Sequence, residues 1–335
     1  AKASYSVASS DGVNADIEQG KGLGVSNEFT LSASGELDNG MTWSYAQDID
    51  NATVQDDGKL TLTTDFGTLG VFISEGGLDV DNAASQSVLA RPSDTSFGES
   101  MVDSWDLSGM NTLQYHTPAD MLPFGITAKI AYAPSSSSAA AANNSYTAGG
   151  AANTGGFTAA ATAFNSTTAP ITQTAAMGTS ATHYQVKASP IDGLTVGADY
   201  VDYDGVVGAT EQNPESGSYY LTYAFGPATI GYSKSHLATA IGDLTSDRLE
   251  SIEGKKYSIA FNVNDDFSVS YEKEKSTPDM MRNGTGMVEM ESDGVQAAYT
   301  MGGMTIAVAM NDHSGARYTD GMDVKDTVVS VAMAF

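Results

Sequence analysis

The side chains of this chain that could do chemistry are mostly carboxylates, and the densest group lies between residues 74 and 109. This stretch has one basic residue, Arg91, and its acids include Asp79, Asp81, Asp94, Glu99, Asp103 and Asp106. Carboxylate oxygens can coordinate Ca²⁺, and the runs Asp79-Val80-Asp81-Asn82 and Asn264-Asp265-Asp266 place them close together. Both runs also fit a solvated turn, which is the interpretation we favour, so Ca²⁺ stands as an alternative and no other cofactor is expected.

Nothing in the sequence indicates catalysis. Cysteine is absent, which excludes thiolate chemistry and disulfides. The histidines are far apart and lack the spacing of metal ligands; they are His116, His183, His236 and His313. No nucleophile elbow, phosphate-binding loop or EF-hand pattern occurs. We therefore expect a protein that is not an enzyme. Its charged groups would act on ions and solutes through the electric field that they produce.

The elements that must position these charges are extended strands. Along most of the chain, apolar residues alternate with small or polar ones, as in Tyr257, Ile259, Phe261 and Val263. At the end of the chain, Val329, Val331, Met333 and Phe335 share one face, and Ser330, Ala332 and Ala334 share the other. A strand closing a membrane barrel explains a terminal aromatic residue at the lipid interface. A strand of a soluble β-sandwich is the alternative for this segment alone.

Two kinds of connection separate these segments and favour a barrel. Very short ones, such as Asp38-Asn39-Gly40 and Ile191-Asp192-Gly193, suit tight hairpins, whereas others are long, polar and often acidic. Sixteen alternating segments result, with short turns at one end and long loops at the other. Sixteen strands in open soluble sheets would leave many unpaired edges, and closure removes them. The sequence thus predicts one all-β domain over residues 1–335, a transmembrane antiparallel barrel with short periplasmic turns and long extracellular loops.

Composition agrees with this fold and restricts the partners. The chain of 335 residues has 15 Lys and Arg against 41 Asp and Glu, a net charge of -26. Nucleic acid is therefore not an expected partner, because binding it needs a basic surface. No apolar run is long enough for a transmembrane helix, and no signal peptide is recognised.

One long connection, residues 134–180, differs from the rest. It is rich in Ser, Ala, Thr, Asn and Gly, with few charges. We favour a flexible extracellular surface loop. The alternative is a loop that folds over the mouth of the barrel or onto a neighbouring subunit, where its small residues would pack closely.

Two hairpins carry a resemblance to a known family. Residues 35–43 read GELDNGMTW and residues 63–71 read TTDFGTLGV. With the terminal Phe335, they resemble the general porins of Gram-negative bacteria, especially those of alphaproteobacteria. The resemblance implies a bacterial outer-membrane location, a homotrimer and contact with the lipid bilayer and lipopolysaccharide. It also implies passive diffusion of ions and small hydrophilic solutes.

The resemblance further implies that the third loop, residues 74–109, folds into the lumen and forms the constriction. Its acids, Asp79, Asp81, Asp94, Glu99, Asp103 and Asp106, with Arg91, would then face the pore. Alternation turns Lys59, Lys129, Lys187 and Lys256 to the lumen wall, together with Glu28 and Asp199 among other acids. Lys129 and Lys187 should lie at similar height and form a small basic patch.

The function expected from the sequence is a general diffusion porin with weak cation preference, since fixed acids near a pore concentrate cations. A substrate-selective channel is the alternative within transport. Such channels often use rows of aromatic residues, and of the two tryptophans only Trp105 is a lumen candidate, which weakens a sugar channel and leaves selectivity for organic acids or amines open. A soluble secreted β-rich adhesin or Ca²⁺-binding surface protein is the alternative from another class. It explains the acidity but not the alternation of short turns and long loops.

Overall fold

Alternation of apolar and polar residues forms strands along most of the chain. The computed structural model describes residues 2–12, 20–25, 28–50, 57–74, 77–94, 101–107, 109–134, 144–148, 151–152, 172–175, 179–206, 209–242, 249–281, 288–318 and 320–333. In these ranges every helix is a short 3₁₀ turn, and none is long and apolar enough to cross a membrane.

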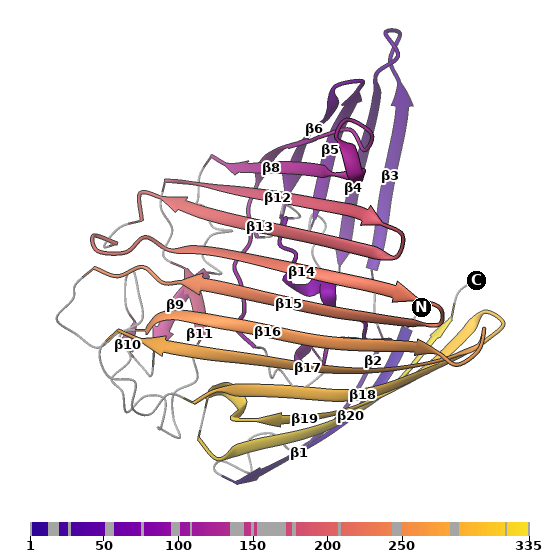
Figure 1. The fold of residues 1–335 in the computed structure, drawn as a ribbon, viewed down its shortest axis with the longest axis vertical. Coiled ribbons are helices and arrows are strands. Elements are labelled where there is room, and N and C mark those ends of the chain that lie inside the picture. Colours follow the sequence, from indigo (N-terminus) through magenta and orange to yellow (C-terminus); the bar gives the residue numbers. More distant parts are fainter. Residues whose placement is uncertain are drawn as a thin grey trace.

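Seventeen strands form one antiparallel sheet in the order β3-β4-β5-β6-β7-β8-β12-β13-β14-β15-β16-β17-β18-β19-β20-β1-β2. Their bounds are β1 Lys2–Gly12, β2 Gly20–Val25, β3 Glu28–Glu36, β4 Thr42–Asp50, β5 Gly58–Thr64, β6 Gly67–Ile73, β7 Thr112–His116, β8 Thr127–Ala133, β12 Ser180–Ile191, β13 Leu194–Asp204, β14 Glu215–Phe225, β15 Ala228–Ala238, β16 Leu249–Asn262, β17 Phe267–Met280, β18 Met290–Met301, β19 Met304–Ser314 and β20 Met322–Met333. Nearly all are neighbours in sequence, so the sheet is a meander (Figure 1).

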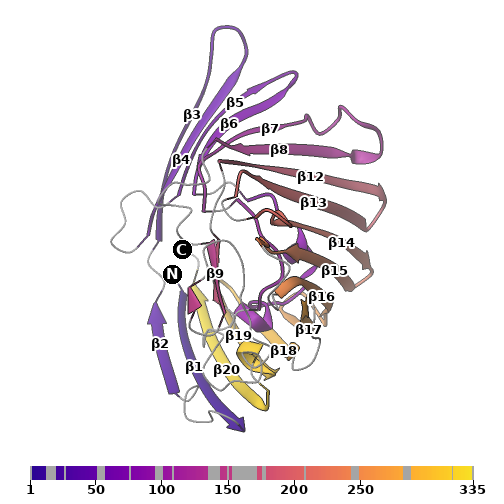
Figure 2. The ribbon, with the colours of Figure 1, turned by 90° about the vertical axis from the view of Figure 1, so that its left-hand side faces the viewer.

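The sheet curls strongly but stays open, where the sequence predicted a closed barrel of sixteen strands. Its two edges are β2 and β3, which face each other across the opening in Figure 2. In the described residues, β2 pairs only with β1 and β3 only with β4. The extra strand is β2, which the alternation of residues did not predict; it pairs with β1, as β3 pairs with β4. Joined end to end, β2 and β3 would complete one strand between β1 and β4.

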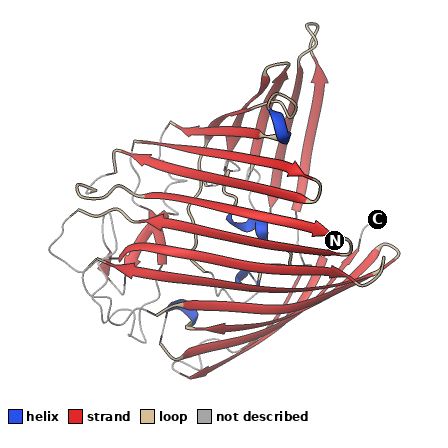
Figure 3. Cartoon of the chain, in the orientation of Figure 1, coloured by secondary structure: helices blue, strands red, loops and turns tan. Residues whose placement is uncertain are grey.

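The short turns lie at one end of the strands, which we call the turn edge, and the long loops lie at the other end (Figure 3). At the turn edge, Gly193 has φ of 76°, and a Cβ there would approach the Ala224 carbonyl oxygen to 2.4 Å. Only glycine accepts this left-handed backbone and close approach. Within the loop at residues 134–180, the strands β9 (Asn144–Ala148), β10 (Ala151–Ala152) and β11 (Thr172–Ala175) pair into a separate small sheet.

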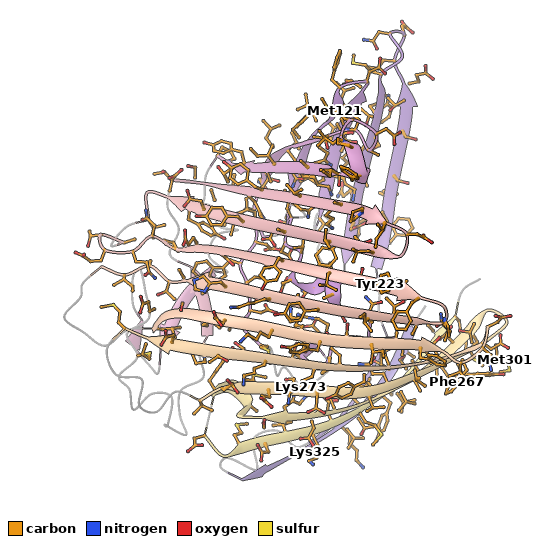
Figure 4. The ribbon with its side chains drawn as sticks, viewed as in Figure 1. Met121, Tyr223, Phe267, Lys273, Met301 and Lys325 are labelled. Atoms are coloured by element: carbon orange, nitrogen blue, oxygen red, sulfur yellow. The ribbon has the colours of Figure 1, made fainter. Side chains whose placement is uncertain are left out.

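Along the strands, large apolar side chains are exposed on the convex face, and several polar side chains are buried on the concave face. On β16, Tyr257 is 51% exposed on the convex face, whereas Lys256 is 1% exposed on the concave face. Phe267, Tyr223 and Met301 lie near the turn edge (Figure 4). Tyrosines on several strands are exposed on the convex face, namely Tyr132, Tyr200, Tyr219, Tyr257 and Tyr271. A continuous outward apolar surface of this extent indicates contact with lipid or with another protein.

The last described strand follows the expected alternation. In β20, Ser330 is 3% exposed on the concave face and Met333 is 50% exposed on the convex face. Phe335 lies outside the described residues.

Candidate functional site

The connection between β6 and β7 crosses the concave face of the sheet, carrying the 3₁₀ turns η1 (Asp81–Ala84) and η2 (Pro92–Asp94) (Figure 2). We call its described residues 77–94 and 101–107 the inner loop. The turn η1 contacts β14, β15 and β16, and η2 contacts β17, β18 and β19. The inner loop is therefore held along the middle of the concave face of the sheet, which we call the wall.

Polar side chains of the wall satisfy the backbone of the inner loop. The amide of Val80 donates to Asp199 at 3.1 Å, and that of Ser93 donates to Glu274 at 2.9 Å. Farther along, the Trp105 amide donates to the Ser216 hydroxyl at 2.9 Å. A buried loop needs such partners, because an unpaired backbone group away from water is costly. The wall provides them from strands far apart in the sequence.

The wall also leaves room for the backbone of the inner loop. A Cβ added at Gly231 on β15 would lie 1.8 Å from the Ala84 carbonyl oxygen. The same carbonyl accepts a hydrogen bond from the Ser258 hydroxyl on β16 at 2.5 Å. Gly231 thus permits the close approach of η1 to the sheet.

Charged groups join the inner loop to β16 and β17. The Lys256 ammonium lies 2.7 Å from an Asp81 oxygen and 2.5 Å from an Asp103 oxygen. The Arg91 guanidinium lies 3.1 Å from Asp103 and 3.5 Å from Glu274. Since Lys256 and Glu274 are fully buried, these pairs are shielded from water and strongly coupled.

Arg91 also binds Asp94 with two hydrogen bonds, 2.8 and 2.9 Å long. Such a bidentate contact fixes the guanidinium plane. The Asp94 side chain is 52% exposed, so its charge reaches the open side of the inner loop. Asp81 and Asp103 instead face the wall. The resemblance implied that all these acids line a pore. In the structure, only part of their negative charge is directed away from the wall.

Burial and mutual repulsion change the protonation of the acids in the inner loop. Burial, together with the nearby carboxyls of Asp81 and Asp106, raises the pKa of Asp79 to about 9. Burial and Asp103 also raise the pKa of Asp81, against the opposing effect of Lys256. Although burial favours its protonated form, Asp103 has a pKa below the usual range because Lys256 and Arg91 stabilise the anion. Asp79 is therefore protonated at neutral pH, and Asp103 is charged.

An apolar cluster anchors the returning arm of the inner loop. Trp105 packs edge-on against Tyr203 of β13, with ring centroids 5.7 Å apart. Leu107 and Met110 are fully buried in the same cluster, which includes Leu249 of β16. The Tyr203 hydroxyl donates to the Asp106 carbonyl at 3.0 Å. Trp105, the one tryptophan that the sequence made a lumen candidate, is thus buried between the inner loop and the sheet.

The other residues predicted to line the lumen lie at several places in the structure. Lys59 on β5 is half-buried, Asp199 on β13 is buried, and the side chain of Glu28 lies outside the described residues, as does Glu99. Lys129 and Lys187 lie on adjacent strands, with Lys129 opposite Gln185.

The expected pair of lysines is extended by a residue that the sequence reasoning missed. His116 of β7 lies opposite Lys129. The Lys187 ammonium is 6.0 Å from the Tyr220 ring centroid, and Tyr220 packs against Val80 and Ala84 of the inner loop. The strand alternation of β7 would have placed His116 on this face.

Among the described residues, no group of three or more His, Cys, Asp or Glu side chains is arranged to hold an ion.

No family profile and no curated protein sequence matches this chain. Solved structures do match over its whole length. The anion-selective porin from Comamonas acidovorans has a TM-score of 0.63 at 12% identity, covering 100% of this chain and 98% of that one. The OmpF structure from Salmonella typhi has a TM-score of 0.57 at 9% identity, covering 98% and 96%. A mutant Rh. blastica porin has a TM-score of 0.54 at 12% identity, covering 98% and 97%. The chain has the porin fold.

Proposed function

We propose that this chain forms a water-filled channel in a bacterial outer membrane and passes ions and small hydrophilic solutes by passive diffusion. The observation that carries the proposal is a sheet with large apolar side chains on its convex face and an inner loop held across its polar, concave face. In a closed sheet, the first surface would contact lipid and the second would line and narrow an aqueous path.

The proposal includes closure of the sheet. The edges β2 and β3 are joined in sequence, and each presents one unpaired side in the described residues. Unpaired edges cannot be solvated in a membrane, so closure into a barrel of sixteen strands is required there. A homotrimer, as in the porins that the sequence resembles, is part of the same proposal.

A modest cation preference follows from the charges around the inner loop. Two cations, Lys256 and Arg91, contact the acids Asp81, Asp94, Asp103 and Glu274. The charges of the buried ion pairs largely cancel one another. The exposed carboxylate of Asp94 and the acids of the long loops are therefore the charges that act on passing ions. Their effect decays over about a Debye length, ~8–10 Å at physiological salt, so the preference should weaken as salt rises.

The two alternatives are not favoured. Burial of Trp105 weakens the case for a substrate-selective channel built on tryptophan, and a soluble adhesin would not expose residues such as Tyr257 and Ile259 along a whole face. Liposome swelling tests the proposal: vesicles containing the protein should admit small uncharged sugars at rates that fall steeply with solute size. Vesicles that stay impermeable to every sugar would overturn it.

A further inference from the structure

A tyrosine from another loop reaches the returning arm of the inner loop, residues 101–107. The connection between β19 and β20, residues 315–321, contains the 3₁₀ turn η5 (Ala316–Tyr318). This turn contacts β18 and β20 and is the yellow coil beside them in Figure 2. The Tyr318 side chain is 2% exposed and belongs to the apolar cluster that holds Val102. Tyr318 therefore connects the loop end of the last strands to the inner loop.

The Tyr318 hydroxyl completes a closed cycle of three hydrogen bonds at Val102. The Val102 amide donates to the Tyr318 hydroxyl at 2.9 Å, and the Ser276 hydroxyl of β17 donates to the Val102 carbonyl at 2.5 Å. The hydroxyl oxygens of Tyr318 and Ser276 are 2.6 Å apart. Because Ser276 gives its proton to Val102, the Tyr318 hydroxyl is the donor to Ser276. Hydrogen bonds linked in this way strengthen one another.

Both polar groups of the Val102 backbone depend on this cycle. Val102, Ser276 and Tyr318 are all buried, and a buried backbone group that loses its partner is costly. The next residue in the chain, Asp103, contacts Lys256 and Arg91. A shift of the Val102 backbone would therefore also move Asp103 away from the two cations that join the inner loop to the wall.

The backbone at Tyr318 is strained in the conformation that brings its hydroxyl to the inner loop. Its φ is 55°, in the left-handed region that a bulky side chain rarely adopts. Strain of this kind persists only where surrounding contacts hold the residue, and it is concentrated at functional sites. The contacts of Tyr318 with Val102 and Ser276 are the ones that hold it here. The strain thus indicates a turn shaped to place this hydroxyl.

We propose that Tyr318 is a positioning residue of the channel, through which the β19–β20 loop keeps the returning arm of the inner loop against the wall. The inference rests on the proposed function, because the position of this arm affects transport only if the concave face lines an aqueous path. With the hydrogen-bond cycle intact, the arm stays on the wall and the path stays open. With the cycle broken, the arm leaves the wall more often and briefly narrows the path.

Hydrogen exchange of the purified protein in detergent, combined with single-channel recording, tests the inference. Tyr318→Phe keeps the aromatic ring and removes the hydroxyl, which leaves the Val102 amide without its acceptor. Exchange in the peptide that contains Val102 and the frequency of brief current closures should both rise about tenfold, because both report the opening of the same arm. Ser276→Ala breaks the cycle from β17 and should change both measurements in the same direction.

The matched control is Tyr200→Phe. It removes a tyrosine hydroxyl that donates to Glu215 at 2.6 Å on the convex face, away from the inner loop. Its exchange in the peptide that contains Val102 and its closure frequency should equal those of the wild type.

Each other outcome overturns the inference. Unchanged exchange in Tyr318→Phe would mean that the hydroxyl does not position the arm, and faster exchange without more closures would mean that the arm does not control the path. Equal changes in Tyr200→Phe would mean a general loss of stability. Should Tyr318→Phe fail to fold, Ser276→Ala decides by the same criteria. A wild type that forms no channel refutes the proposed function, whereas exchange at Val102 tests the contact of Tyr318 without any channel.

Discussion

Lys256 on β16 places its ammonium nitrogen 2.7 Å from a carboxylate oxygen of Asp81, which lies 175 positions earlier in the chain. Asp103 contacts the same ammonium at 2.5 Å. One buried lysine therefore binds both arms of the inner loop to the wall.

Replacing this lysine should loosen the inner loop. Lys256→Met leaves Asp81 buried without its cation and leaves Asp103 with Arg91 alone, and losing one partner of a buried pair typically costs about 3–5 kcal/mol. We expect noisier single-channel currents and a lower unfolding temperature. The triple variant Lys256→Met/Asp81→Asn/Asp103→Asn should recover quiet currents, because no buried charge is left unpaired. Equally noisy currents from both variants would contradict an electrostatic anchor.

Cation preference should rise in alkaline solution as Asp79 loses its proton. The pKa of Asp79 is raised from 3.8 to about 9, chiefly by burial. Reversal potentials of the wild type should therefore shift toward cations as pH passes about 9, whereas Asp79→Asn should not show this step. The control Asp120→Asn removes an exposed acid at the turn edge and should retain it. A step that persists in Asp79→Asn would assign the titration to another group.

The proton on Asp79 also affects the stability of the fold, and the direction of this effect with pH can be measured. The folded protein binds this proton more tightly than the unfolded chain. The contribution of Asp79 to the free energy of unfolding is therefore fully present below pH 3.8 and is lost as the pH rises toward about 9. Over that interval, the unfolding temperature of Asp79→Asn should fall less with pH than that of the wild type. Parallel curves for the two proteins would contradict the proton assignment.

Gly231 should be intolerant of side chains because η1 lies against it. In Gly231→Val the new Cβ would overlap the Ala84 carbonyl oxygen, 1.8 Å away, and the start of the inner loop must move. We expect an altered conductance with a normal β-sheet content by circular dichroism. Gly24→Ala is the control, since its nearest neighbouring atom would be 3.8 Å away. Unchanged conductance in Gly231→Val would place the inner loop elsewhere.

The strand alternation predicted much of this arrangement. It correctly turned Lys256 and Asp199 to the concave face and Tyr257 to the convex face, because a period of two is a local property of a strand. It could not predict that Asp81 and Asp103 contact the wall instead of facing a pore. Their positions depend on Lys256, Arg91 and the space at Gly231, which are distant in the sequence. The alternation likewise did not predict β2 (Gly20–Val25), most of which the sequence pattern assigned to a long loop.

Spin labels on β20 test the orientation of the sheet in a membrane. Ser330 is 3% exposed on the concave face, and Val331 follows on the opposite face. A label at 331 should be relaxed by lipid-soluble oxygen, and a label at 330 by a water-soluble nickel complex, because adjacent strand residues point to opposite sides. The same relaxation profile at both positions would exclude a membrane-spanning strand.

Planar-bilayer recording in a KCl gradient tests the central claim most directly. The purified wild-type protein should insert as discrete, ohmic conductance steps. The reversal potential should have the sign of a cation preference, larger at low salt than at high salt because mobile ions screen the fixed charge. Bilayers that show no conductance steps would contradict the channel itself, and an anion-selective reversal potential would contradict the charge arrangement proposed around the inner loop.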